Sequence, residues 1–188
     1  MPLLFSDVMV KARMESMLRS LALGLVALIA QASWAMAAGE GGCSAFEWPL
    51  DKELGWMADA NAKDASSGGK LDIPPESAIM LKLKPQASVV FPLPPGGKPK
   101  GDPKEMFGGV LTFDGVPKPG IYQGTLSSVG WVDVVQGGAV LPAAGHTGIK
   151  DCAAIRKSVR FEIGSGPFAL QFSGVPQDSI KIAVRAAP

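Results

Sequence analysis

Short segments in which apolar and polar residues alternate fill the second half of the chain. Eight of them follow one another, each rich in β-branched or aromatic residues and bounded by Gly, Pro, Asp or Ser. They cover residues 79–84, 87–92, 108–113, 120–126, 131–136, 158–163, 168–174 and 179–185. This pattern predicts an all-β fold, an antiparallel β-sandwich with a jelly-roll-like arrangement and one short N-terminal helix.

The alternation also assigns a direction to each side chain. Because successive residues of a strand point to opposite faces, Val159, Phe161 and Ile163 are predicted to face the core, with Arg160 on the other side. By the same rule, Asp133 is expected on an exposed sheet face, where it needs no special role.

The predicted helix lies in residues 45–60, where Trp48, Leu54 and Met57 recur at helical spacing. Pro49 suits the first turn of such a helix because that turn needs no backbone donor. The helix is expected to pack on the core. Residues 65–70, ASSGGK, follow it and predict a flexible turn.

Residues 92–105 break the β pattern with five prolines and three glycines. Proline lacks the donor that a central strand requires, so the segment is expected to be an exposed loop or a crossing at a sheet edge. Two interpretations remain open. It is a stiff connection across the open end of the sandwich, or a proline-rich ligand for a partner groove.

Residues 1–37 have a different composition from the rest. A basic start, an uncharged run over residues 20–30 and small residues at Ala35 and Ala37 predict a secretory signal peptide. Cleavage is expected after Ala37, with Ala35 as the alternative. The start codon stays open between Met1, Met14 and Met17.

Export implies a periplasmic or secreted protein with no transmembrane span after cleavage. The remaining chain is divided into a helical segment at 38–78 and a β-sandwich at 79–188. Residues 1–37 hold three of the 18 basic and two of the 17 acidic residues, which leaves 15 of each. A net charge of zero argues against a nucleic-acid partner.

The two cysteines, Cys43 and Cys152, are predicted to form a disulfide, because an even cysteine count in an oxidising compartment favours pairing. Two separate buried thiols are the alternative. The wide spacing matches neither CxxC redox chemistry nor the common zinc motifs.

The sequence contains few of the residues that common catalytic sites require. His146 is the only histidine, no G-x-S-x-G elbow or phosphate-binding motif occurs, and we expect neither a metal nor another cofactor. Three aspartates, Asp59, Asp64 and Asp72, match no EF-hand spacing. The stretch AAGHTGIKDC, residues 143–152, is predicted to be a loop ending at Cys152, and its candidate ligand or partner residues are His146, Lys150 and Asp151.

Several motifs carry a resemblance to known proteins. The chain has an early CSAFEWPLDKEL, then GIYQGTL, GWVDVV, a late cysteine and a closing LQFSG…IKIAV pair. It thereby resembles small exported proteobacterial proteins that often bear a homogentisate dioxygenase label. That label implies an iron site of histidines and a glutamate, which one histidine does not supply. The GIYQGTL…WVDVV rhythm is also similar to bacterial pre-peptidase C-terminal domains, which implies a β-sandwich.

Two functional hypotheses follow. The first is an exported non-catalytic module that binds a protein or carbohydrate partner, as an accessory subunit of an envelope complex or a binder of a carbohydrate or small ligand. The alternative is a periplasmic hydrolase that uses paired carboxylates. Two carboxylates converging in a pocket would favour the enzyme, and an aromatic surface would favour the module.

Overall fold

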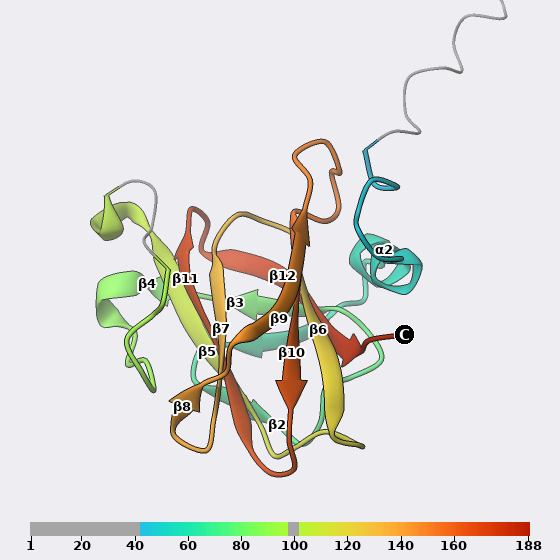
Figure 1. Ribbon diagram of the computed structural model, residues 1–188. Coiled ribbons are helices and arrows are strands. Elements are labelled where there is room, and N and C mark those ends of the chain that lie inside the picture. The colour runs from blue at the N-terminus through green and yellow to red at the C-terminus, as the bar shows by residue number, and fades with distance from the viewer. Residues whose placement is uncertain (1–41, 98–101) are drawn as a thin grey trace, which may run out of the picture. The chain divides into compact units, whose positions relative to one another are not determined.

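Two β-sheets pack face to face in the computed structural model, which describes residues 42–97 and 102–188 (Figure 1). The first sheet has the order β1 (Lys63–Ser66), β3 (Ile79–Lys82), β12 (Ser179–Ala186), β6 (Gly120–Leu126), β10 (Lys157–Ile163) and β9 (Ala143–Gly148). The second has the order β2 (Gly69–Leu71), β5 (Phe107–Phe113), β11 (Phe168–Val175), β7 (Trp131–Gln136) and β8 (Ala139–Val140), and β4 (Lys84–Pro85) also pairs with β5. The predicted β-sandwich is confirmed. Its strand pairs are antiparallel except β1–β3 and β2–β5, which are parallel.

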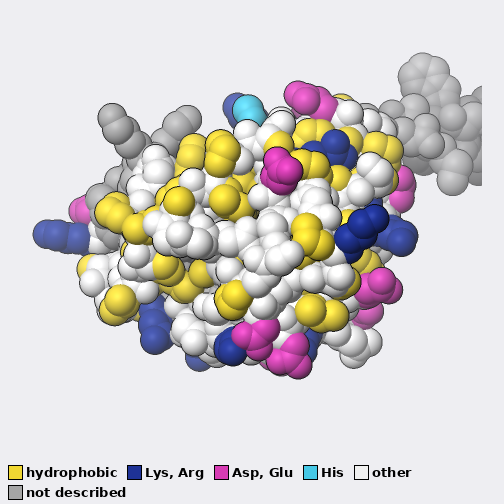
Figure 2. All heavy atoms as spheres, turned by 60° about the horizontal axis from the view of Figure 1, so that its bottom comes forward, with side chains coloured by type: hydrophobic (Ala, Val, Ile, Leu, Met, Phe, Trp, Pro, Cys, Tyr) yellow, Lys and Arg dark blue, Asp and Glu magenta, His cyan; other side chains and the backbone are white. Residues whose placement is uncertain are grey.

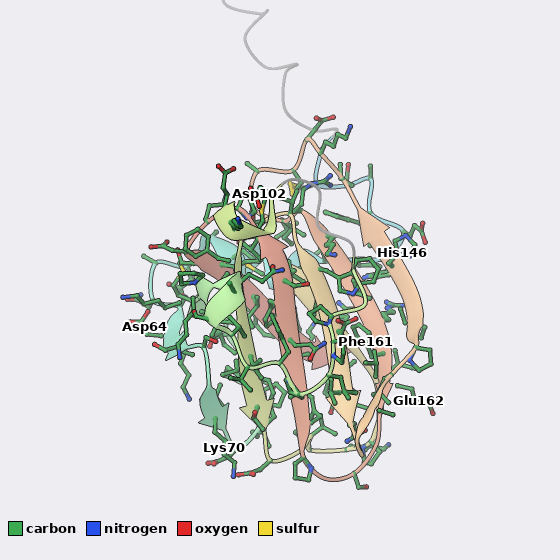
Figure 3. The ribbon with its side chains drawn as sticks, turned by 90° about the vertical axis from the view of Figure 1, so that its left-hand side faces the viewer. Asp64, Lys70, Asp102, His146, Phe161 and Glu162 are labelled. Carbon is green, nitrogen blue, oxygen red and sulfur yellow. A yellow bond between two sulfur atoms is a disulfide. The ribbon has the colours of Figure 1, made fainter. Side chains whose placement is uncertain are left out.

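The main core lies between the sheets and is built from the inward rows that the alternation predicts. Phe161 is 3% exposed, whereas its neighbour Glu162 is exposed on the opposite side of β10 (Figure 3). Phe113 of β5 and Phe168 of β11 stack with their ring centroids 4.9 Å apart. These rows bury the apolar surface that holds the two sheets together.

Helix α2 (Asp51–Ala58) covers the outer face of the first sheet and packs against β12. It is shorter than the predicted range because the chain becomes helical only after Leu50, so Pro49 precedes the helix. A second apolar cluster forms beneath it and includes Leu50, Met57 and Ala183 of β12. The predicted packing of this helix on the body of the domain is confirmed.

The segment before residue 79 also contributes two strands that the sequence pattern did not predict. β1 lies at the edge of the first sheet and β2 at the edge of the second, with only Ser67 and Gly68 between them. Gly68 has φ +92°, a conformation that glycine adopts without strain. The predicted flexible turn over 65–70 was therefore too wide, because backbone pairing with β3 and β5 orders these polar residues.

One predicted strand is wrong. Residues 87–92 do not join a sheet. The first two lie in the 3-10 turn η1 (Gln86–Ser88), the others follow it, and Val90 is 91% exposed. Pro85 before the segment and Pro92 at its end lack backbone donors, which lowers its capacity for ladder pairing. A second 3-10 turn, η2 (Pro103–Glu105), precedes β5.

The predicted loop containing His146 is also wrong in part. Residues 143–148 form β9, an edge strand whose His146 pairs with Val159 of β10. Its small residues show no alternation of apolar and polar types, so no strand is predicted there. The strand forms because its backbone pairs with β10. The chain leaves β9 through an exposed bend at Lys150 and Asp151 before it reaches Cys152.

The predicted disulfide between Cys43 and Cys152 is confirmed. Such a bond points to a compartment outside the reducing cytoplasm. Residues 1–37, for which the sequence predicts a signal peptide, lie outside the described part of the chain. No helix in residues 42–97 and 102–188 is long and apolar enough to cross a membrane.

Candidate binding cleft

An open cleft of about 750 Å³ lies where β9 and β10 of the first sheet approach β7 and β11 of the second. This volume falls within the range of about 300–1,000 Å³ that is usual for small-ligand sites. The side chains that give it chemical character are those of Glu47, Trp131, His146, Thr147, Arg156, Lys157 and Ser173. One wall therefore belongs to each sheet, and the N-terminal segment supplies Glu47.

Trp131 provides a large apolar surface in this cleft. It begins β7 and points away from the core, since Val132 next to it points inward, and it remains 46% exposed. Its indole Nε1 donates a hydrogen bond of 2.6 Å to Asp133 Oδ1. This bond restrains the rotation of the ring, so the exposed surface is oriented before any ligand arrives.

Asp133 is buried, at 5% exposure, which overturns the expectation of an exposed sheet face. Besides the Trp131 bond, its Oδ2 accepts hydrogen bonds from Gln171 Nε2 at 3.1 Å and from the backbone N–H of Gly96 at 3.0 Å. Three N–H donors thus compensate for the water that this carboxylate loses. The sequence pattern missed this because the covering residues come from a segment far away in the chain.

That covering segment, residues 86–97, is here named the strap. The sequence analysis offered a connection across the open end of the sandwich as one interpretation of residues 92–105. Of that range, residues 92–97 instead cross the outer face of the second sheet. Gln86 Oε1 accepts a bond of 2.6 Å from Gly174 N–H, and Leu93 N–H donates to Gln171 Oε1 at 3.4 Å. Its prolines are tolerated because the strap contacts the sheet through side chains and a few amides instead of a ladder.

The strap also abuts Trp131. A Cβ placed on Gly97 would overlap the Trp131 ring, and one on Gly96 would lie 3.1 Å from Asp133 Oδ1. The two glycines therefore permit the close approach of strap and ring.

We predict that Gly97→Ala lowers the free energy of unfolding by about 1–3 kcal/mol, because the added methyl displaces either the strap or the ring. Gly115→Ala is the control, since its nearest neighbour would lie at 3.7 Å, an ordinary contact. Urea denaturation of both variants gives the comparison. Equal stabilities for the two would show that the strap does not hold Trp131.

The other wall of the cleft is basic. The Lys157 Nζ lies 5.4 Å from the centroid of the Trp131 ring, a cation–π geometry. Burial lowers the pKa of the Lys157 ammonium below its ordinary value, the nearby Arg156 charge lowers it further, and Asp133 partly opposes the shift. Arg156 is held in place because its Nη1 donates to the Ile149 carbonyl at 2.7 Å.

Of the three residues proposed from the sequence as a ligand or partner group, the structure brings only His146 to the cleft. It is exposed on β9, which forms one edge of the first sheet, while β1 with Asp64 forms the other edge (Figure 3). Lys150 and Asp151 are exposed on the bend and do not line the cleft. Trp131 and Lys157 were missed, although an aromatic residue on the outward side of a predicted strand was a usable signal.

Acidic groups are sparse in the cleft. Of the residues that the structure describes, Glu47 is the one carboxylate that lines the cleft, and both oxygens of the Asp133 carboxylate accept hydrogen bonds. Among the described residues, no three His, Cys, Asp or Glu side chains converge in a group suited to a metal ion. The face visible in Figure 2 mixes charges of both signs with apolar residues.

Comparisons with known proteins identify no relative. No family model matches the chain, and no curated protein or solved structure matches it either. The two resemblances noted from sequence motifs therefore stay predictions, and the cleft itself is the basis for a functional proposal.

Proposed function

We propose that the protein is an exported, non-catalytic module that binds a carbohydrate in the cleft beside Trp131. The observation that carries this proposal is the half-exposed Trp131 ring, held by Asp133 and surrounded by polar side chains. Periplasmic localisation or secretion follows from the predicted signal peptide, and the disulfide supports an oxidising compartment.

A sugar suits this cleft because it combines an apolar face of C–H groups with a rim of hydroxyls. The rigid indole of Trp131 offers the C–H face of the sugar a flat contact at low entropic cost. His146 and Ser173 offer hydrogen-bonding groups to the sugar hydroxyls. Binding sites for small ligands commonly pair an apolar contact surface with a few polar groups in this way.

The hydrolase alternative has less support. Acid–base cleavage of a glycosidic bond uses two carboxyl groups on opposite sides of the bond. In the described part of the chain, Glu47 is the single carboxylate that lines the cleft, and the carboxylate of Asp133 accepts hydrogen bonds from N–H groups of Trp131, Gln171 and Gly96. This arrangement favours binding over turnover.

We predict that Trp131→Ala weakens saccharide binding by about tenfold or more, since truncation of a central aromatic contact commonly costs that much. A glycan array with the purified protein identifies the saccharide, and calorimetry then measures its affinity for both proteins. Trp56→Ala is the control, because Trp56 lies on helix α2, packs against the second apolar cluster and does not line the cleft. An unchanged affinity in Trp131→Ala, or equal losses in the two variants, would contradict the assignment of the site.

A further inference from the structure

Two positive charges in the cleft, those of Lys157 and Arg156, form no ion pair with the described residues. The ion pairs within the described residues are Lys70–Asp114 and Arg185–Glu53, so neither Lys157 nor Arg156 takes part in one. Lys157 is half-buried against the Trp131 ring, and Arg156 is adjacent in sequence and lines the same cleft. Burial costs Lys157 part of its hydration, and the attraction of Asp133 offsets only part of that loss.

The two side chains are also positioned to act together. The Nη1 of Arg156 donates a hydrogen bond to the Ile149 carbonyl, which orients the guanidinium and leaves its other N–H groups to bind a ligand. Lys157 begins β10, whose pairing with β6 and β9 fixes its backbone. Their charges lie close enough for Arg156 to disfavour protonation of Lys157. An anion between them would relieve this repulsion.

We infer that the cleft selects an acidic saccharide, whose sugar ring lies against Trp131 and whose anionic group is bound by Lys157 and Arg156. This inference rests on the proposed function and adds the charge of the ligand to it. The carboxylate of Glu47, in the N-terminal segment, accepts hydrogen bonds from sugar hydroxyls. The anionic group of the ligand accepts hydrogen bonds from the N–H groups of Lys157 and Arg156 at the basic wall.

The partial desolvation of Lys157 gives the inference a pH signature. Because burial and Arg156 lower the pKa of the free Lys157 side chain, a bound anion raises that pKa again, and binding takes up a proton between the two values. Affinity for the acidic saccharide should therefore be full below the free-state pKa and fall as the pH rises through it. Asp133, Glu47 and His146 also face this region and are present in every variant compared.

The test compares matched ligands by calorimetry on the full disulfide-bonded protein. Uronic acid trisaccharides of the common linkages are measured beside their neutral methyl esters, and sulfated saccharides beside their desulfated parents. We expect an anionic member to bind about tenfold or more tightly than its neutral parent, which corresponds to ~1.4 kcal/mol. The pair that shows the preference distinguishes a carboxylate from a sulfate as the source of the charge.

Variants assign the preference to Lys157. Because Arg156 remains, Lys157→Met should lower the ratio of anionic to neutral saccharide affinity and remove the part of its pH dependence that Lys157 supplies, whereas Lys157→Arg should retain most of that ratio. Lys82→Met is the matched control, because Lys82 is an exposed lysine on β3, toward the opposite edge of the first sheet. A thermal melt shows whether Lys157→Met is folded, and we expect it to be at least as stable as the wild type, because a partly desolvated charge is removed.

The outcomes separate the two proposals. Equal binding of acidic and neutral members would overturn the charge inference and leave the carbohydrate function intact. Absence of binding to every saccharide in the panel and on the array would overturn both. An undiminished preference for the anion in Lys157→Met would overturn the assignment to this residue.

Discussion

Arg185→Met is expected to lower the free energy of unfolding by about 3–5 kcal/mol, the usual cost of leaving a buried charge without its partner. Glu53 of helix α2 is fully buried, and its Oε1 accepts a bond of 2.6 Å from Arg185 Nε on β12. The same oxygen accepts a bond of 2.5 Å from Gln123 Nε2 on β6. Methionine preserves much of the apolar length of arginine but supplies neither charge nor donor.

The network extends further along the outer face of the first sheet. Gln123 Oε1 accepts from Arg160 Nε at 3.2 Å, and the Arg160 guanidinium lies 4.1 Å from the centre of the Trp48 ring. Glu53 Oε2 and Trp48 Nε1 are buried and have no hydrogen-bond partner among the described residues. The carboxylate therefore depends on Arg185 and Gln123, and removal of the arginine leaves one neutral donor for a buried charge.

Lys70→Met provides the control for this prediction. Lys70 and Asp114 form an ion pair whose side chains are 60% and 46% exposed, and such surface pairs contribute little to stability because water screens them. Urea denaturation at neutral pH measures both variants. The double variant Glu53→Leu, Arg185→Met should recover stability relative to Arg185→Met, because it removes the stranded charge. If Arg185→Met cost no more than Lys70→Met, the network would not be the element that fixes α2 to the sheet.

The sequence could predict the strands because their signal is local. Each of β3, β5, β6, β7, β10, β11 and β12 carries its own alternation of apolar and polar residues, and inward residues such as Phe161 become buried as expected. The short edge strands β1, β2 and β9 lack that alternation. Their order comes from backbone hydrogen bonds to neighbours, which depend on the assembled sheet rather than on the segment itself.

Buried polar contacts were out of reach for the same reason. Glu53 suits the first turn of a helix and Asp133 suits an exposed sheet face when each is judged from its neighbours in sequence. Their partners lie far along the chain, at a sequence separation of 132 for Glu53 and Arg185 and of 37 for Gly96 and Asp133. His146 was a candidate because it is the only histidine, whereas Trp131 and Lys157 gain their importance from strands of opposite sheets meeting at the cleft.

Loss of the Cys43–Cys152 disulfide is expected to cost about 4–5 kcal/mol on the chain-entropy model, because the bond closes a loop over a sequence separation of 109 residues. Cys43→Ala and Cys152→Ala should lower the free energy of unfolding by similar amounts. The double variant should be no less stable than the less stable of the two single variants. Alanine avoids the buried hydroxyl that serine would place at residue 152, which is 5% exposed. Denaturant titrations with and without a reductant measure these differences.

The disulfide also holds the N-terminal segment against β9 at one wall of the cleft, so its loss should lower the affinity for the ligand. Cys43 lies just before Glu47, whose backbone N–H donates to Thr147 Oγ1 of β9 at 3.0 Å, and Cys152 follows β9 after a short bend. Reduction frees the N-terminal segment from this anchor, and we expect weaker saccharide binding in the reduced wild type. The double alanine variant is the control, because a reductant should change neither its stability nor its affinity. If reduction lowered stability in that variant as well, the effect would arise outside the disulfide and the stabilising role assigned to this loop closure would be wrong.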